Sequence, residues 1–222
     1  MVLEIISVFF YRNKRLIFDN FNLKLKKSQT MILIGSNGIG KTTLFELIVG
    51  ILEPQKGIIK INNHLIQNMF EKKRKNFTYL PHKDGLKENL TILENIKNWN
   101  YLSANKNDFE KIKSSLDYFD LFKIKDENVG NLSQGQRKKI SLSKLLLSKN
   151  LLWLLDEPFN GLDSDSIIKT KKILENHRKT GGVVLLSSHI DVKIKSSRKI
   201  VLNKLKQKKR RDISEINTWE EL

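Results

Sequence analysis

The sequence GSNGIGKTT occupies residues 35–43, directly after the apolar stretch TMILI at residues 30–34. It matches the pattern G-x-x-x-x-G-K-[ST], in which glycines let backbone N–H groups converge on a phosphate without Cβ clashes. Apolar residues at helical spacing follow between residues 42 and 52, so a strand, a loop and a helix start occur in the expected order. We predict a phosphate-binding loop made of Gly35, Ser36, Asn37, Gly38, Ile39, Gly40, Lys41, Thr42 and Thr43.

The run LLWLLDEP at residues 151–158 places two carboxylates at the carboxyl end of a second strand, where ligands bind in open α/β sheets. Asp156, with the hydroxyl of Thr42, is predicted to hold Mg²⁺, and Lys41 to neutralise the β- and γ-phosphates. Glu157 would polarise the attacking water as general base. An acidic pair alone would indicate only a solvated strand end, but the phosphate loop upstream favours this catalytic interpretation.

His189 ends the run VVLLSSH at residues 183–189, another strand of the same pattern. A single histidine is usually either exposed to solvent or held by ordinary hydrogen bonds, without a catalytic role. Here it leaves a buried strand at the edge that also carries Asp156, and from there it could reach the γ-phosphate or the attacking water. We therefore add it to the predicted catalytic residues.

Composition limits the possible functions of this chain of 222 residues. It carries 41 Lys and Arg against 24 Asp and Glu, a formal charge of +17, and no cysteine. Disulfides and thiolate metal sites are excluded, and no apolar run is long enough to span a bilayer. The basic residues are dispersed and lack an aromatic reading motif, so we predict no specific nucleic-acid binding. The excess of positive charge also predicts attraction to an anionic membrane surface as a secondary effect. The N-terminal residues indicate a strand, not a signal or transit peptide.

The pattern along the chain predicts an α/β fold in one nucleotide-binding domain. Strands are expected near residues 3–8, 21–25, 30–34, 57–61, 151–155 and 183–187, with a turn at 11–15. Helices are expected at 42–52, 108–119 and 134–148. A further helix is expected to begin at a capping box formed by Thr91 and Glu94. The continuous apolar strands favour the centre of a largely parallel sheet. We expect a body of about 1–84 and 150–203 and a helical subdomain of about 85–149, followed by a charged, solvated tail at 204–222.

Five motifs together resemble the ATP-binding cassette (ABC) family of ATPases, over about residues 2–203. They are GSNGIGKTT, LSQGQ at 132–136, LLDEP, NGLD at 160–163 and the strand-ending His189. The resemblance implies a P-loop ABC cassette with a RecA-like mixed sheet, a helical subdomain and an N-terminal antiparallel β part. It also implies ATP and Mg²⁺ as ligands, and a homodimer stacked head to tail around two ATPs. The signature residues that would face the partner's ATP are Ser133, Gln134, Gly135 and Gln136.

The resemblance also assigns two further positions. Asp163 would lie at the seam between the copies, near the partner's γ-phosphate. Tyr11 precedes the second strand, where the family stacks an aromatic residue on adenine, but Phe10 competes for that role and Tyr11 could be an ordinary turn residue. The free N–H groups at the helix start after Ser133 suit an anion, which supports the signature assignment.

A closer resemblance lies at residues 79–95, YLPHKDGLKENLTILEN. Most cassettes have glutamine at the position of His82, whereas the ATPase subunits of the cytochrome c maturation haem exporters have histidine there. That family also has a similar G-[LI]-K-x-x-L-T-x-x-E-N run, tryptophan before the acidic motif, as at Trp153, and two glycines before the histidine strand, as at Gly181 and Gly182. His82 would act in γ-phosphate sensing or coupling.

This second resemblance implies a peripheral ATPase that works with a membrane permease and haem-handling membrane proteins in c-type cytochrome biogenesis. It would lie on the inner membrane, on the cytoplasmic face in a bacterium or the matrix face in a mitochondrion, and couple through residues 85–103. Three alternatives remain at this point: a cassette for another substrate such as a lipid or a drug, a non-transport ABC protein acting on ribosomes or DNA, and a nucleotide-binding subunit without hydrolysis.

Overall fold

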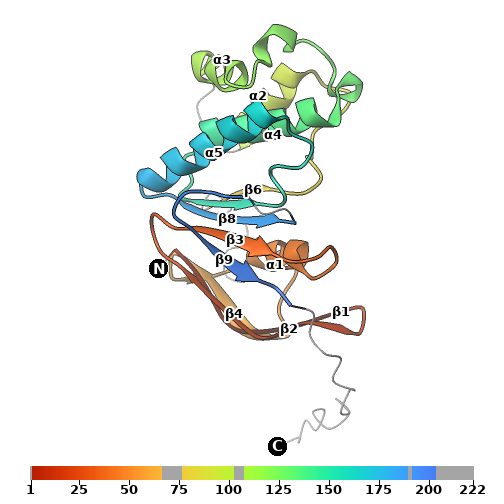
Figure 1. Ribbon diagram of the computed structural model, residues 1–222. Helices are drawn as coiled ribbons and strands as arrows, with labels where there is room; N and C mark the ends of the chain where they lie inside the picture. The colour runs from red at the N-terminus through yellow and green to blue at the C-terminus, as the bar shows by residue number, and fades with distance from the viewer. Residues whose placement is uncertain (1, 67–76, 103–107, 190–191, 204–222) are drawn as a thin grey trace, which may run out of the picture.

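The computed structural model describes residues 2–66, 77–102, 108–189 and 192–203. These residues form two β-sheets and five α-helices stacked in layers (Figure 1). The first sheet is antiparallel, with the strand order β2-β1-β4-β5. Its strands are β1 (Leu3–Arg12), β2 (Arg15–Leu25), β4 (Lys56–Ile61) and β5 (His64–Leu65). This sheet is the predicted N-terminal antiparallel part.

The second sheet is parallel at every pairing and has the order β6-β7-β8-β3-β9. Its strands are β3 (Thr30–Ile34), β6 (Phe77–Leu80), β7 (Leu152–Leu155), β8 (Val183–Ser188) and β9 (Ser197–Val201). All residues of β7 and β8 are buried. Both faces of the sheet are covered, which explains why these strands are continuous apolar runs without alternation.

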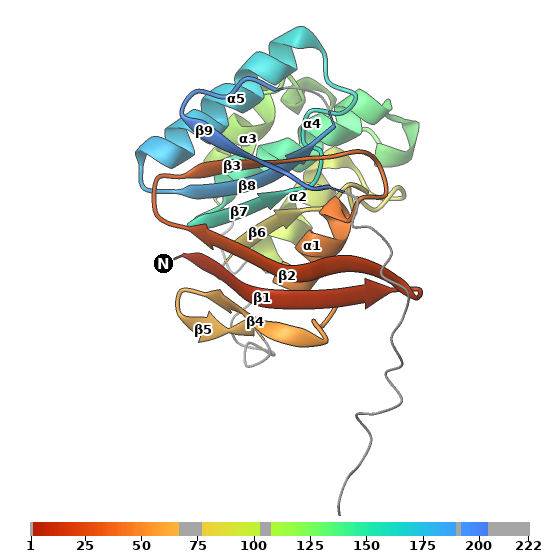
Figure 2. The same cartoon turned by 60° about the horizontal axis from the view of Figure 1, so that its bottom comes forward.

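The helices lie on both sides of the parallel sheet (Figures 1 and 2). They are α1 (Lys41–Ile48), α2 (Ile92–Leu102), α3 (Phe109–Asp117), α4 (Gln134–Leu147) and α5 (Ser164–Lys179). Helix α1 lies between the two sheets, and α4 and α5 cover the opposite face of the parallel sheet. Helices α2 and α3 pack against α4 at the far end of the molecule. In the described part of the chain, no helix is both long and apolar enough to cross a bilayer.

The alternation of side chains along the parallel strands divides the core in two. Leu152 and Leu154 of β7 face the antiparallel sheet and α1, in one cluster of buried residues. Trp153 and Leu155 face the helices on the other side, in a second cluster. The carboxyl end of β7 is therefore fixed from both faces, which positions the residues that follow it.

Helix starts were predicted well and some element ends were not. The capping box is present, because Thr91 Oγ1 accepts from the N–H of Glu94 and Glu94 accepts from the N–H of Thr91. The predicted turn at 11–15 was too long: only Asn13 and Lys14 form it, and β2 starts at Arg15. The first helix ends at Ile48, earlier than predicted, before a glycine with positive φ. The predicted tail at 204–222 lies outside the described residues.

Candidate active site

The predicted phosphate-binding loop connects the end of β3 to the first turn of α1. Gly38 and Gly40 have φ values of 72° and 117°, the left-handed region that side chains disfavour. The Nζ of Lys41 donates to the carbonyl oxygen of Gly35 at 2.6 Å, and the side chain is only 6 % exposed. The loop therefore surrounds its own lysine and directs the ammonium group to the place where it would meet phosphate oxygens.

The carboxylate of Asp156 is fixed behind this loop. Its Oδ2 accepts from the Thr42 hydroxyl at 2.6 Å, and its Oδ1 accepts from the Ser187 hydroxyl at 2.6 Å. Asp156 is 1 % exposed. The two predicted Mg²⁺ ligands, Thr42 and Asp156, are thus in contact although 114 positions separate them. Carboxylate and hydroxyl oxygens are ligands that Mg²⁺ accepts, usually with substrate phosphates and waters completing its shell.

Glu157 follows Asp156 with a φ of 50°, an uncommon conformation for a residue with a side chain. Its backbone N–H donates to Ser187 Oγ at 2.8 Å, so one serine holds both acidic residues. Its Oε2 accepts from Asn160 Nδ2 at 2.5 Å and lies 2.6 Å from His189 Nδ1. Its Oε1 lies 3.5 Å from Lys41 Nζ. The predicted base therefore sits between the phosphate loop and the histidine at the end of β8.

The charge state of Glu157 follows from opposing effects. Burial raises the pKa of Glu157, but hydrogen bonds from His189 and Asn160 and the nearby charge of Lys41 lower it by more, so the pKa lies below its usual range. The carboxylate is ionised at neutral pH and acts only as an acceptor. His189 Nδ1 must then carry the proton that it shares with Glu157.

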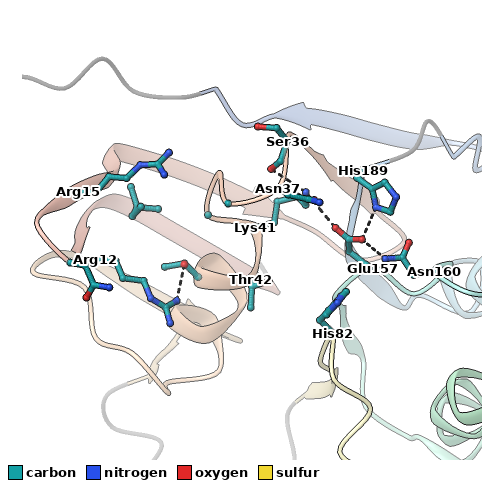
Figure 3. Close-up of a pocket in the computed structure, with 15 residues that line it drawn as sticks. Arg12, Arg15, Ser36, Asn37, Lys41, Thr42, His82, Glu157, Asn160 and His189 are labelled. Carbon is teal, nitrogen blue, oxygen red and sulfur yellow. Dashed lines mark hydrogen bonds and ion pairs between the residues drawn. The ribbon is translucent and has the colours of Figure 1, made fainter. Parts of the chain in front are cut away.

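A cleft of about 640 Å³ opens over these residues (Figure 3). Figure 3 shows the phosphate loop in its centre, with His82, Glu157, Asn160 and His189 on one side and Arg12 and Arg15 on the other. His82, the residue that departs from the general cassette pattern, thus shares the cleft with the predicted base. The lining residues are Arg12, Asn13, Arg15, Ile17, Ser36, Asn37, Gly38, Gly40, Lys41, Thr42, Thr43, His82, Glu157, Asn160 and His189.

Neither aromatic candidate for adenine stacking lines this cleft. Tyr11 packs edge-on against Phe9, with ring centroids 5.2 Å apart, and its backbone bonds to the side chain of Gln55. Phe10 is 5 % exposed and belongs to the core between the sheets. The cleft wall at this end comes from the neighbouring residues of the β1–β2 hairpin, beginning with Arg12.

The signature residues lie outside the cleft of their own chain. Ser133 caps α4, accepting from the N–H of Gln136, whose side chain accepts in turn from the N–H of Ser133. A Cβ on Gly135 would lie 2.8 Å from the carbonyl oxygen of Gly161, so glycine is required there by a contact within the chain. A Cβ on Gly161 would in turn lie 3.8 Å from the side chain of Gln134. The start of α4 therefore packs on the turn that precedes α5.

Asp163 has a structural role in the single chain. Its side chain caps α5 by accepting from the N–H of Ser166 at 2.8 Å, and it pairs with Lys139 Nζ at 2.8 Å. The hydrogen bond from Lys139 and the cap hold the pKa of Asp163 well below its usual range. Through this pair, Asp163 connects α5 to α4.

The tryptophan noted in the sequence and the second of the two glycines, Gly182, both pack against the ring of His177. The ring of His177 stacks on Trp153, with centroids 3.5 Å apart and planes 3° from parallel. A Cβ on Gly182 would lie within 2.3 Å of the His177 ring. Burial lowers the pKa of His177 more than its bond to the Leu151 carbonyl raises it, so the neutral ring donates from Nε2 to that oxygen. Only glycine therefore fits at position 182 beside the ring of His177.

Sequence reasoning missed Ser187 and Asn160. Ser187 stands on β8 two positions before His189, which follows directly after the strand. Asn160 belongs to the quoted NGLD motif and lies three positions after Glu157. The positions of Ser187 and Asn160 near predicted catalytic residues could be seen in the sequence, but only the fold shows what their polar groups contact.

Comparison with known proteins supports the same interpretation. Residues 18–160 match the ABC transporter family. The chain is 38 % identical to a cytochrome c biogenesis ATP-binding export protein CcmA from Reclinomonas americana, covering 86 % of each chain, and 33 % identical to one from Histophilus somni, covering 88 % of this chain and 90 % of that one.

Solved structures agree. An ATP-binding subunit of an ABC transporter has a TM-score of 0.77 and 27 % identity over 86 % of this chain and 80 % of the other. An ABC transporter ATP-binding protein from Pyrococcus furiosus has a TM-score of 0.77 and 26 % identity over 91 % and 98 %. The chain therefore belongs to the ABC transporter family, as an ATP-binding protein of the CcmA type.

Proposed function

We propose that this chain is the ATP-hydrolysing subunit of a membrane complex that exports haem, or releases a haem-loaded chaperone, during c-type cytochrome biogenesis. ATP binding and hydrolysis follow from its family. The names of its relatives and the run around His82 support the cytochrome c assignment. We further propose a peripheral location on an inner membrane, beside a permease, with residues 85–103 providing the coupling surface.

The residues of the cleft have distinct roles in the proposed reaction. Lys41 and the N–H groups of the loop bind the β- and γ-phosphates, which keeps the terminal phosphorus close to Glu157. The ionised Glu157 accepts the proton of the attacking water. His189 donates from Nδ1 to that carboxylate and orients it. Mg²⁺, held by Thr42 and Asp156, would neutralise charge on the β- and γ-phosphates when it is bound.

The observation that supports this proposal is that the cleft of one chain contains only part of the predicted ATP site. Lys41, Glu157 and His189 line one cleft, with Asp156 behind it on Thr42, whereas the start of α4 after Ser133 lies outside it. The N-terminus of a helix attracts anions, but the start of α4 does not line the cleft that holds the phosphate loop of its own chain. We infer that two copies stack head to tail, and that each places its signature residues on the ATP held by the other.

Mixing two defective variants tests this arrangement. Lys41→Ala removes the phosphate loop function of one copy, and Ser133→Arg blocks the signature of another. If the sites are shared, a mixed dimer contains one intact site, so random mixing should restore ATPase activity, to at most about a quarter of the wild-type level. Sites built within one chain would give no restoration.

The cargo needs a separate experiment with the membrane partners present. We expect the wild-type chain, expressed with its permease and haem-handling proteins, to co-purify with them and to support covalent haem attachment to a reporter c-type cytochrome. Glu157→Gln should keep ATP binding and the complex but lose both turnover and cytochrome assembly. A cassette for a lipid or a drug would neither join that complex nor affect the cytochrome.

A further inference from the structure

The wall of the cleft opposite Glu157 is the tip of the β1–β2 hairpin. Arg12 and Arg15 are register partners that flank a two-residue turn, whose residues Asn13 and Lys14 have φ values of 49° and 64°. Paired residues of an antiparallel ladder project to the same face. Both arginines therefore point to the cleft side, and both line it (Figure 3).

The same alternation explains why no aromatic residue lines this wall. Tyr11 pairs with Leu16, one position removed from the arginine pair, so the two project to the opposite face of the hairpin. Ile17, two positions after Arg15, returns to the cleft face and lines it. Its Cγ2 would lie 2.5 Å from a Cβ on Gly40, so it packs directly on the phosphate loop.

The two arginines differ in what they contact. Arg12 donates to Glu46 Oε2 at 2.6 Å and to Thr43 Oγ1 at 3.1 Å, so its charge is used to attach the hairpin to α1. Arg15 lines the cleft with no hydrogen bond or ion pair to any residue that the structure describes, and it is only partly exposed. The cleft thus contains one guanidinium group without a partner, beside the apolar side chain of Ile17.

We propose that Arg15 recognises the base of ATP, stacking its guanidinium plane on the purine ring while Ile17 packs against the nucleoside. With the phosphates on the Lys41 loop and the terminal phosphate near Glu157, a nucleotide along the cleft has its base at the hairpin end. A planar, weakly hydrated guanidinium stacks well on aromatic rings, which a lysine ammonium cannot do. The inference rests on ATP binding by the family, and not on the cargo.

The binding of ATP, UTP and inorganic tripolyphosphate to the full chain tests this assignment by calorimetry. Arg15→Ala should weaken ATP binding about fivefold, the upper range of an exposed cation–π contact. It should leave tripolyphosphate binding within about twofold and reduce the preference for ATP over UTP, because pyrimidines offer less area for stacking. Arg15→Tyr should recover ATP affinity, since tyrosine stacks without charge, whereas Arg15→Lys should not.

Two controls make the outcome decisive. Lys14→Asn removes an equal charge from the same turn, with a side chain that tolerates positive φ, and should change none of the affinities. Lys41→Ala should weaken all three ligands. The proposal is overturned if Arg15→Ala leaves ATP affinity unchanged, or if it weakens ATP and tripolyphosphate equally and Lys restores both, because Arg15 would then act on phosphates. Neither result bears on haem export, which no part of this assay uses.

Discussion

Ser187→Ala removes one oxygen atom that holds both acidic residues of the site. The hydroxyl donates to Asp156 Oδ1 at 2.6 Å and accepts from the N–H of Glu157 at 2.8 Å, and the side chain is fully buried. A hydrogen bond to a charged group contributes about 1.5–3 kcal/mol, and a buried N–H left without a partner costs about 1–3 kcal/mol. Because the two losses share one atom, we expect a combined destabilisation of about 3 kcal/mol.

Ser141→Ala is a matched control for this change. Ser141 is also buried, but its hydroxyl has no hydrogen-bond partner among the described residues. Its removal should be neutral or slightly stabilising, because a buried polar group without a partner costs free energy.

Urea unfolding and thermal scans of both variants measure the difference. For a chain of this size, about 3 kcal/mol lowers the melting temperature by about 6–12 °C. We also expect kcat to fall about tenfold or more in Ser187→Ala, because the base is displaced from the phosphate loop. The reasoning is refuted if Ser187→Ala is no less stable than Ser141→Ala.

Three more outcomes follow from the contacts described. Asn160→Ala removes a hydrogen bond that lowers the pKa of Glu157, so the acid limb of the kcat profile should move to higher pH; an unshifted limb would contradict the base assignment. Gly182→Ala should destabilise the chain in urea by about 2 kcal/mol through its clash with the ring of His177, and adding His177→Ala should recover part of that loss. Burial lowers the pKa of Lys144 to about 8, although Asp84 opposes the shift, so the unfolded state binds more protons above that pH. Stability of the wild type relative to Lys144→Met should therefore rise from about pH 8 to about pH 10, with the variant more stable at pH 7, and parallel pH curves would argue against a buried charge.

The parts of the fold that sequence predicted are those fixed by local chemistry. The capping box at Thr91 and the helix starts at Asp108 and Ser133 depend on hydrogen bonds within three residues. The strands at 30–34 and 151–155 depend on burial from both faces. No prediction named α5, β6 or β9. Strand β9 has no fully buried residue, so it lacks the apolar pattern that marks a strand.

The residues of the site likewise divide into those that local chemistry predicts and those that it does not. Sequence named Lys41, Thr42, Asp156 and Glu157 because their chemistry follows a phosphate loop and a strand end, and the fold brings them together. It named Tyr11 from resemblance alone. A shift of one position along a strand moves a side chain to the opposite face of the sheet. The bulges between residues 5 and 11 of β1 cause such shifts, and no local sequence pattern reveals them.

The contact of Gly135 with Gly161 has a consequence for communication between nucleotides. Gly161 lies four positions after Glu157, and Gly135 lies in the segment proposed to meet the partner's ATP. A displacement of the start of α4 by the partner's nucleotide would move the Gly161 carbonyl, and with it the short segment that carries Asn160 and the base. In a head-to-tail dimer, this would make hydrolysis at one site depend on occupancy of the other. Cooperativity would then need no relay element beyond the close approach of Gly135 to the Gly161 carbonyl.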